Sequence, residues 1–291
     1  MQRGKGATPV PQDKRYRSGS AAAGGGMLVL WLTMQGKAWL EREWLTLLPE
    51  TAAAGIGLLL QLVMLGLPLV VILRLLRQPM VALCPLKRGK NGSLWLLPAG
   101  LAVLLGANLL TMLLQRLFSE ADRFAPAALP QSTPALVLSL VGAILLPAVM
   151  EELLFRGAVL HALRPAGETA AIWLSALLFM GAHGSLTQWL PALAAGLLLG
   201  AVTFYTGTLR WGILIHLCNN VVAWLTTYHP SPVTTVILPA VLLIWGAVAV
   251  LMLRRLPHRL PQPGNIRQGM TVPLALALLL LLGNALLYPV H

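Results

Sequence analysis

The chain has 291 residues, of which 57% are apolar and only 10% are charged, and its mean hydropathy is +0.76. This composition is typical of a polytopic membrane protein and excludes an ordinary soluble domain. The formal net charge of +12 would suggest a nucleic-acid-binding surface in a soluble protein, but here the Lys and Arg residues lie in the tails and in short loops between apolar runs. Membrane topology explains that distribution, so no nucleic-acid partner is expected.

The first 50 residues differ from the rest of the chain. Residues 1–20 are basic and rich in Gly, Pro and Ser, which predicts a disordered tail because they have almost nothing to bury. Residues 21–34 are apolar but short and Gly-rich, so 21–50 is expected to be a short hydrophobic or interfacial segment followed by a loop. Whether 21–34 crosses the membrane stays open. A transmembrane domain is predicted from 51 to 291.

Eight apolar runs follow, several of them about 20 residues long, the length that a helix needs to cross ~30 Å of bilayer hydrocarbon. Within the bilayer every backbone polar group must find its partner inside the protein, which favours helices. The sequence therefore predicts an all-α fold, a polytopic transmembrane helix bundle with about eight spans. The predicted spans are residues 52–73, 94–114, 135–160, 170–183, 188–206, 211–227, 233–253 and 271–289.

Lys and Arg in the loops predict the orientation. The loops 74–93 and 254–270 are the richest in basic residues, and alternating spans place them on the same side of the membrane as Arg164 and Arg210. The positive-inside rule makes that side cytoplasmic.

Three ionisable residues, Glu151, Glu152 and Arg156, lie inside the apolar run LVGAILLPAVMEELLFRG. A charged residue near the bilayer centre costs roughly 2.5–3.5 kcal/mol, so such groups usually face a protein interior or a wet cavity and are candidates for function. Residues four apart share a helix face, so Glu152 and Arg156 can pair along their own helix. Glu151 is rotated by about 100° and can point elsewhere.

Two further apolar helices carry polar pairs at helical spacing, Phe179 with His183 and His216 with Asn220. If the three helices meet, their side chains can hydrolyse an amide. Glu151 would take a proton from water with the help of His183. The His216 and Asn220 side chains would stabilise the oxyanion, and such donors are typically worth ~3–4 kcal/mol each. A zinc ion held by Glu151, His183 and His216 would use the same residues, so the sequence leaves the cofactor open.

The three motifs EExxxR, FxxxH and HxxxN, in this order on apolar helices, resemble the CAAX-protease and bacteriocin-processing (CPBP, or Abi-like) family of intramembrane proteases. The Ras-converting CAAX prenyl endopeptidase is related to this family. The resemblance covers about 135–225, the expected protease core. It implies an eight-helix fold with a catalytic cavity inside the membrane. The family is often labelled a metalloprotease family, although a metal-independent glutamate mechanism is also argued for it.

The resemblance also implies roles by motif position. The first glutamate of EExxxR is the general base together with the histidine of FxxxH, and the histidine and asparagine of HxxxN stabilise the oxyanion. The second glutamate and the arginine form a supporting pair. The implied catalytic residues are Glu151, His183, His216 and Asn220, with Glu152 and Arg156 in support.

The leading hypothesis is therefore an intramembrane endopeptidase that hydrolyses peptide bonds of membrane-embedded or lipid-anchored substrates with a glutamate-activated water. It is expected to be a multi-pass protein of the bacterial inner (plasma) membrane, with the lipid bilayer and a peptide or protein substrate as its partners. A non-catalytic scaffold or immunity protein of the same fold is one alternative, and the complete set of motifs argues against it. A proton-coupled transporter is the other, and the lack of a paired inverted repeat argues weakly against it.

Other polar and small residues predict packing. Gly196 and Gly200 have the small-xxx-small spacing that lets membrane helices approach closely. Asn108 is expected to hydrogen-bond between helices. Asn219 faces about 100° away from Asn220 and is expected to be a helix-contact or cavity residue.

Overall fold

The computed structural model describes residues 12–86, 93–117, 128–254, 262–264 and 270–287, and these ranges contain helices, turns and short connections but no β-strand. The helices are α1 Gln12–Glu43, α2 Glu50–Leu76, α3 Met80–Leu83, α4 Leu96–Leu117, α5 Thr133–Leu140, α6 Leu146–Glu151, α7 Leu160–Leu163, α8 Glu168–Ala182, α9 Leu186–Thr206, α10 Arg210–Tyr228, α11 Leu238–Leu253 and α12 Val272–Leu287.

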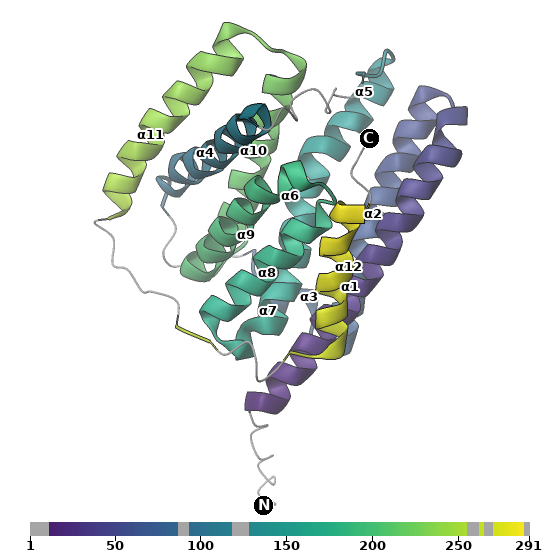
Figure 1. Ribbon diagram of the computed structural model, residues 1–291, viewed down its shortest axis with the longest axis vertical. Coiled ribbons are helices and arrows are strands. Elements are labelled where there is room, and N and C mark those ends of the chain that lie inside the picture. The colour runs from purple at the N-terminus through teal and green to yellow at the C-terminus, as the bar shows by residue number, and fades with distance from the viewer. Residues whose placement is uncertain (1–11, 87–92, 118–127, 255–261, 265–269, 288–291) are drawn as a thin grey trace, which may run out of the picture.

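The helices form a bundle with a central segment and two flanks (Figure 1). Helices α1, α2 and α12 lie along one side, and α4, α9, α10 and α11 lie along the other. The segment from α5 to α8 runs between them. This confirms the all-α polytopic bundle that the apolar runs predicted.

Five helical stretches of the described chain are long and apolar enough to cross a membrane, which supports an integral membrane protein. Helices α8 and α12 are apolar but shorter. Helix α10 is absent from the set because His216, Asn219 and Asn220 lower its hydropathy. The five stretches are 50–76, 96–114, 133–166, 186–206 and 233–253, and each overlaps a predicted span.

The N-terminal helix is longer than the sequence predicted. Residues 12–20 are helical, whereas composition placed them in a disordered tail, and 21–34 is the middle of the 32-residue helix α1. Tyr16 and Ser20 are buried, and the Ser20 hydroxyl is 2.9 Å from the Thr271 hydroxyl. Gly19 packs directly on the Ala162 carbonyl. These tertiary contacts, which composition does not reveal, order the basic segment from Gln12 onward; residues 1–11 lie outside the described part.

The stretch 133–166 is one helical run with two π segments, Val141–Leu145 and Glu152–Val159. Pro147 follows the first π segment. Because proline has no N–H and its ring pushes on the carbonyl four residues earlier, it disturbs the preceding turn. Single-turn π segments occur frequently at functional sites, and the second one here carries Glu152 and Arg156.

Small residues bring helices α8 and α9 into close contact. A Cβ atom on Gly196 would lie 2.7 Å from Ala176 Cα, and one on Gly200 would lie 3.3 Å from Ile172 Cγ2. The predicted small-xxx-small spacing therefore forms a helix–helix contact. It holds α9 against the helix that leads to His183.

The short segment after α2 packs against the second π segment. The buried Cys84 thiol donates a hydrogen bond to the Leu153 carbonyl at 3.5 Å, and the Leu209 N–H donates to the Pro85 carbonyl at 3.0 Å. A Cβ atom on Gly157 would clash with Cys84 Sγ and lie 3.5 Å from the Leu83 carbonyl oxygen. Only glycine at 157 lets the α3 segment sit this close to the helix with the buried charges.

Substituting Gly157→Ala should lower the free energy of unfolding by about 1–3 kcal/mol, because the added methyl overpacks this contact. The matched control is Gly106→Ala, also within a helix, where a Cβ atom meets nothing within 4 Å. That control should be neutral or stabilising because alanine is the better helix former. Thermal unfolding of the purified proteins in detergent measures both, and equal melting temperatures for the two variants would contradict the packing argument.

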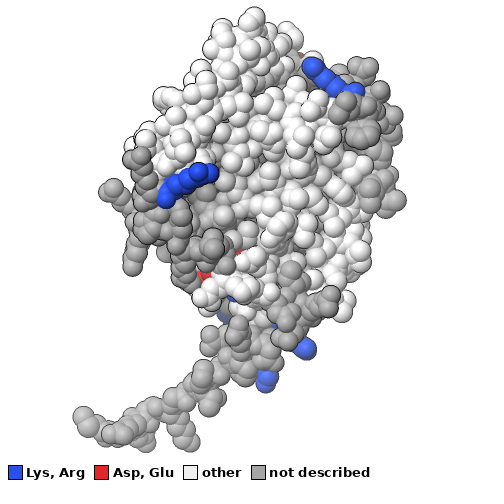
Figure 2. All heavy atoms as spheres, turned by 60° about the vertical axis from the view of Figure 1, so that its left-hand side comes forward, with Lys and Arg blue, Asp and Glu red and all other residues white. Residues whose placement is uncertain are grey.

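Charged side chains lie at the margins of the face drawn in Figure 2, and the middle of that face is uncharged. The described ends of α2 and α11 and the start of α10 carry Arg77, Arg254 and Arg210. Arg164 lies at the same end of the bundle. There the segment after α3 meets the start of α10, because the Leu209 N–H donates to the Pro85 carbonyl. Large apolar side chains such as Trp245 are exposed between the two ends. This is the surface expected of a protein surrounded by lipid.

Candidate active site

Glu152 and Arg156 form a fully buried ion pair. Arg156 Nη1 donates to Glu152 Oε1 at 2.8 Å, with side-chain exposures of 1% and 0%. Arg156 Nη2 donates to the Ala195 carbonyl on α9 at 3.1 Å, and its guanidinium carbon lies 4.1 Å from the centre of the Phe179 ring. Helices α8 and α9 thus both contact the arginine. The burial of two opposite charges is tolerated because each has a charged or polar partner.

His216 joins this pair from α10. Its Nδ1 donates to Glu152 Oε1 at 3.1 Å, and its Nε2 is 3.8 Å from Glu151 Oε2. One imidazole therefore faces both adjacent glutamates, although 64 positions separate His216 from Glu152 in the sequence. A hydrogen bond from one ring nitrogen to a carboxylate fixes the orientation of the ring and presents the other nitrogen.

The two glutamates have different surroundings. Glu152 is fully buried, whereas 17% of the Glu151 side chain is exposed. Within the described residues, the Glu151 side chain makes one polar side-chain contact, the approach of His216 Nε2 to its carboxylate. The helical rotation between the neighbours produces this difference, since Glu152 faces Arg156 one turn later and Glu151 points to another side.

His183 follows the last turn of α8. Its Nδ1 is 2.8 Å from the Phe179 carbonyl oxygen, so Nδ1 is the protonated nitrogen and Nε2 carries the lone pair. The Phe179 ring lies edge-on to both imidazoles, with centroid distances of 4.6 Å to His183 and 6.2 Å to His216. Phe179 thus lies in contact with both histidines of the predicted set and over the Arg156 guanidinium.

Asn220 lies one turn after His216 on α10. Its side-chain Nδ2 donates to the Ile144 carbonyl at 3.3 Å, within the first π segment. That bond uses one of the two amide protons and leaves the second proton and the carbonyl oxygen available. The helical run 133–166 thus contacts α10 at two points along its length, at Ile144 through Asn220 and at Glu152 through His216.

Sequence reasoning missed three residues that shape this centre. Phe179 was noted for its spacing and not as a site residue. Gly212 on α10 lies against the buried pair, because a Cβ there would be 2.8 Å from Glu152 Oε2. Thr203 Oγ1 and Glu152 Oε2 are both buried without a hydrogen-bond partner in the described structure. No spacing rule singles out Gly212 or Thr203, since both act across helix–helix contacts.

The predicted zinc ligands do not assemble into a metal site in the described part of the chain. No group of three His, Cys, Asp or Glu side chains there is spaced to hold a metal ion. Glu151 and His216 approach each other, while His183 Nδ1 bonds a backbone carbonyl. These residues therefore do not fit a three-ligand zinc site as they stand.

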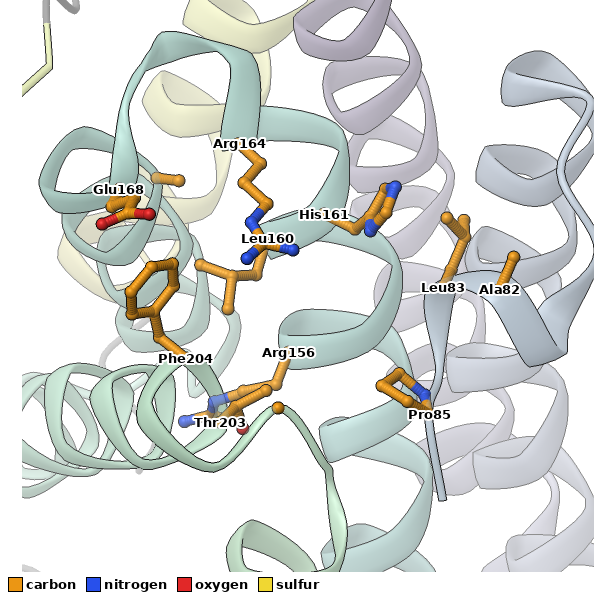
Figure 3. A pocket seen from close by; sticks show the side chains of 12 residues that line it. Ala82, Leu83, Pro85, Arg156, Leu160, His161, Arg164, Glu168, Thr203 and Phe204 are labelled. Carbon is orange, nitrogen blue, oxygen red and sulfur yellow. The ribbon is translucent and has the colours of Figure 1, made fainter. Parts of the chain in front are cut away.

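A cavity of about 130 Å³ lies beside the buried arginine (Figure 3). Arg156 and Thr203 form one wall, and Arg164, at the basic end of the bundle, projects into the same space. The Arg164 guanidinium carbon is 5.3 Å from the Phe204 ring centre. Glu151, His183, His216 and Asn220 are not among the residues that line it. This cavity therefore approaches the supporting pair and not the predicted catalytic residues.

Residues 133–222 match the family model described as type II CAAX prenyl endopeptidase Rce1-like. The matched segment runs from α5 into α10 and contains all three sequence motifs. Comparison with curated proteins and with solved structures finds no match. The matched family implies CAAX-type intramembrane protease activity in general. The match confirms the resemblance that the three motifs predicted, because segment 133–222 of the chain is similar to the Rce1-like family.

Proposed function

We propose that this protein is an intramembrane endopeptidase in which Glu151 activates the attacking water. The contrast between the two adjacent glutamates carries the proposal. Glu152 is buried and bound to Arg156 and His216, and a carboxylate held in an ion pair is a poor base. Glu151 is partly exposed, and among the described residues its side chain is held by the 3.8 Å approach of His216. It is the carboxylate that can accept a proton from water.

In the proposed reaction, water attacks the carbonyl carbon of the scissile amide and gives its proton to Glu151. The His183 Nε2 lone pair accepts a hydrogen bond from that water, because Nδ1 donates to the Phe179 carbonyl. The C–N bond of the tetrahedral intermediate then breaks, and Glu151 returns the proton to the leaving nitrogen. The products are a carboxylate and an amine.

His216 and Asn220 are assigned to the oxyanion. With both ring nitrogens protonated, His216 donates Nδ1–H to Glu152 and has Nε2–H available for the developing negative charge. The free amide proton of Asn220 adds a second donor. Glu152 and Arg156 are positioning residues in this scheme, since they hold His216 and the helix without touching the reacting atoms.

The substrates are expected to be membrane-embedded or lipid-anchored peptide segments, in the inner (plasma) membrane of a bacterium, with the basic end of the bundle cytoplasmic. Comparative membrane proteomics of cells that carry the wild type and cells that carry Glu151→Gln tests the proposal. Uncleaved precursors should accumulate with Glu151→Gln. Identical membrane proteomes would count against a protease function.

A proton-coupled transporter is the second candidate, because buried carboxylates at membrane depth also serve as proton relays. The two candidate functions differ in the activity that they predict, proton transport or peptide cleavage. Proton flux into proteoliposomes with no peptide cleaved would favour the transporter, and cleavage without flux would favour the protease. A non-catalytic scaffold predicts neither activity.

Metal removal separates the glutamate scheme from the zinc scheme. We expect turnover by the purified enzyme to survive exhaustive chelation, because the predicted ligands do not assemble in the described structure. Elemental analysis of the chelated, active sample is the control. Loss of activity on chelation, with recovery only on addition of zinc, would replace the glutamate scheme with a metal-assisted one.

A further inference from the structure

A groove of about 430 Å³ lies between α4 from Leu101 onward, the second half of α10, the first residues of α9 and the start of the helical run 233–253. This volume falls in the usual range for small-ligand sites. Helices α10 and α11 join at the end of the bundle drawn at the top of Figure 1. The groove is thus at the end opposite Arg77, Arg164 and Arg254. It is separate from the cavity of Figure 3 and shares none of its lining residues.

The groove is mainly apolar but contains three carboxamide side chains, those of Asn108, Gln188 and Asn219. None of the three makes a side-chain hydrogen bond to another described residue, so the bond between helices predicted for Asn108 does not form there. Thr111 and Thr226, which also line the groove, are already hydrogen-bonded, because each donates to a carbonyl of its own helix at 2.9–3.0 Å. The half-buried carboxamides of Asn108 and Asn219, and the more exposed one of Gln188, are the groups whose hydrogen-bonding capacity is left for an occupant.

That chemistry selects the kind of occupant. A hydrocarbon chain offers no hydrogen-bond donor or acceptor. Burying a carboxamide against it without a hydrogen bond therefore costs free energy. A continuous transmembrane helix also offers little, since its backbone groups are bonded internally. A locally unwound peptide presents free N–H and C=O groups, which a carboxamide can bind as donor and acceptor at once.

Two parts of the chain that line the groove lie next in sequence to predicted catalytic residues. Asn219 is the neighbour of Asn220, and Ala223 lies two turns after His216 on the same helix face, about 10 Å along the axis. Thr187, at the start of α9, comes four residues after His183. The groove and the predicted catalytic residues thus share helix α10 and lie on either side of the junction between α8 and α9.

We infer that this groove binds an unwound segment of a membrane-embedded peptide substrate, with the side chains of Asn108, Gln188 and Asn219 bonded to its main-chain amides. The inference deepens the proposed protease function and rests on it for the word substrate. Binding at this end means that the segment reaches the site from the side opposite the basic end. An unwound segment is also what hydrolysis needs, since the carbonyl in a helix is already hydrogen-bonded.

Photo-cross-linking to the purified full chain tests the inference. The probes are a Leu/Ala peptide of about 20 residues, long enough to span a bilayer, with a central Gly-Pro pair and a benzophenone side chain beside it. The same peptide with Ala-Ala at the centre stays helical, and a photoreactive palmitic acid represents a lipid tail. All labelling uses the Glu151→Gln protein, so binding is read without turnover, and labelled sites are mapped by mass spectrometry.

The Gly-Pro peptide should label α4, α9 and α10 at the groove at least tenfold more than the Ala-Ala peptide. Asn108→Leu combined with Asn219→Leu should reduce that labelling about tenfold and should not reduce labelling by palmitic acid. The matched control is Gln61→Leu on α2, outside the groove, which should change nothing.

Equal labelling of the groove by the two peptides would overturn the inference, because the groove would then not select an unwound segment. Stronger labelling by palmitic acid would overturn it too and make the groove a lipid site. Full labelling of the double variant would also overturn the inference. If the double variant does not fold, the comparison of the three probes on the parent protein decides alone. Groove labelling together with a complete absence of cleavage by the wild type would remove the protease proposal and leave a peptide-binding groove.

Discussion

Purified Glu151→Gln protein should lose peptide cleavage by roughly 10²–10⁴-fold, the usual contribution of a general base, while staying folded. Gln keeps the size of the side chain and removes the group that takes the proton. Because the Glu151 side chain is partly exposed and its contact is a 3.8 Å approach to His216, the free energy of unfolding should change by less than about 0.5 kcal/mol. Single-turnover cleavage of a precursor found by membrane proteomics, with thermal unfolding in parallel, measures both.

Glu43→Gln is the matched control for that experiment. Glu43 is an exposed residue at the end of α1 that pairs with Arg42, and its loss should leave cleavage intact. A Glu151→Gln protein with wild-type turnover would remove Glu151 as the base. A variant that is inactive but also unfolded would leave His183→Gln as the next test of the water-activating pair. The contacts of His183 in the described part of the chain are a hydrogen bond to a backbone carbonyl at the end of α8 and an edge-on contact with Phe179.

Arg156→Met should destabilise the protein by about 3–5 kcal/mol, because it leaves the Glu152 carboxylate buried without its cation. It also removes the hydrogen bond to Ala195 and the contact over the Phe179 ring. Glu152→Gln should cost a similar amount, since the guanidinium loses its charge partner. Reversible unfolding in mixed micelles of denaturing and mild detergent measures the free energies.

The double variant Glu152→Gln with Arg156→Met should be less destabilised than the sum of the single variants, since it leaves neither charge alone. The control is the pair Lys37 and Glu41 on α1, with side-chain exposures of 23% and 40% and a distance of 2.7 Å. Breaking that pair should cost no more than about 0.5 kcal/mol. Additive effects at Glu152 and Arg156 would show that the two residues act independently.

The buried pair also separates stability from chemistry. His216 loses its carboxylate acceptor in Glu152→Gln but keeps the neighbouring Glu151. A positioning role therefore predicts reduced kcat even at temperatures where the variant is fully folded. Unchanged kcat in the folded fraction would restrict Glu152 to a structural role.

The amino-acid sequence by itself determined the helices and the candidate residues of the site. Long apolar runs must become helices in a bilayer because the backbone has no other partner there, so each predicted span overlaps an observed helix. The i, i+4 spacing of Glu152 and Arg156 was enough to predict contact between them, since that contact lies within one helix. The three motifs were also enough to predict the similarity of segment 133–222 to the Rce1-like family.

Only the tertiary structure decided which helix faces meet. It brings His216 to Glu152 across 64 positions and lays Phe179 over Arg156. It also orders residues 12–20 through contacts of Tyr16 and Ser20 that composition cannot show. Periodicity gives the face of a helix but not its neighbour, and neighbours are chosen by close-packing residues such as Gly212, which lies against the Glu152 carboxylate.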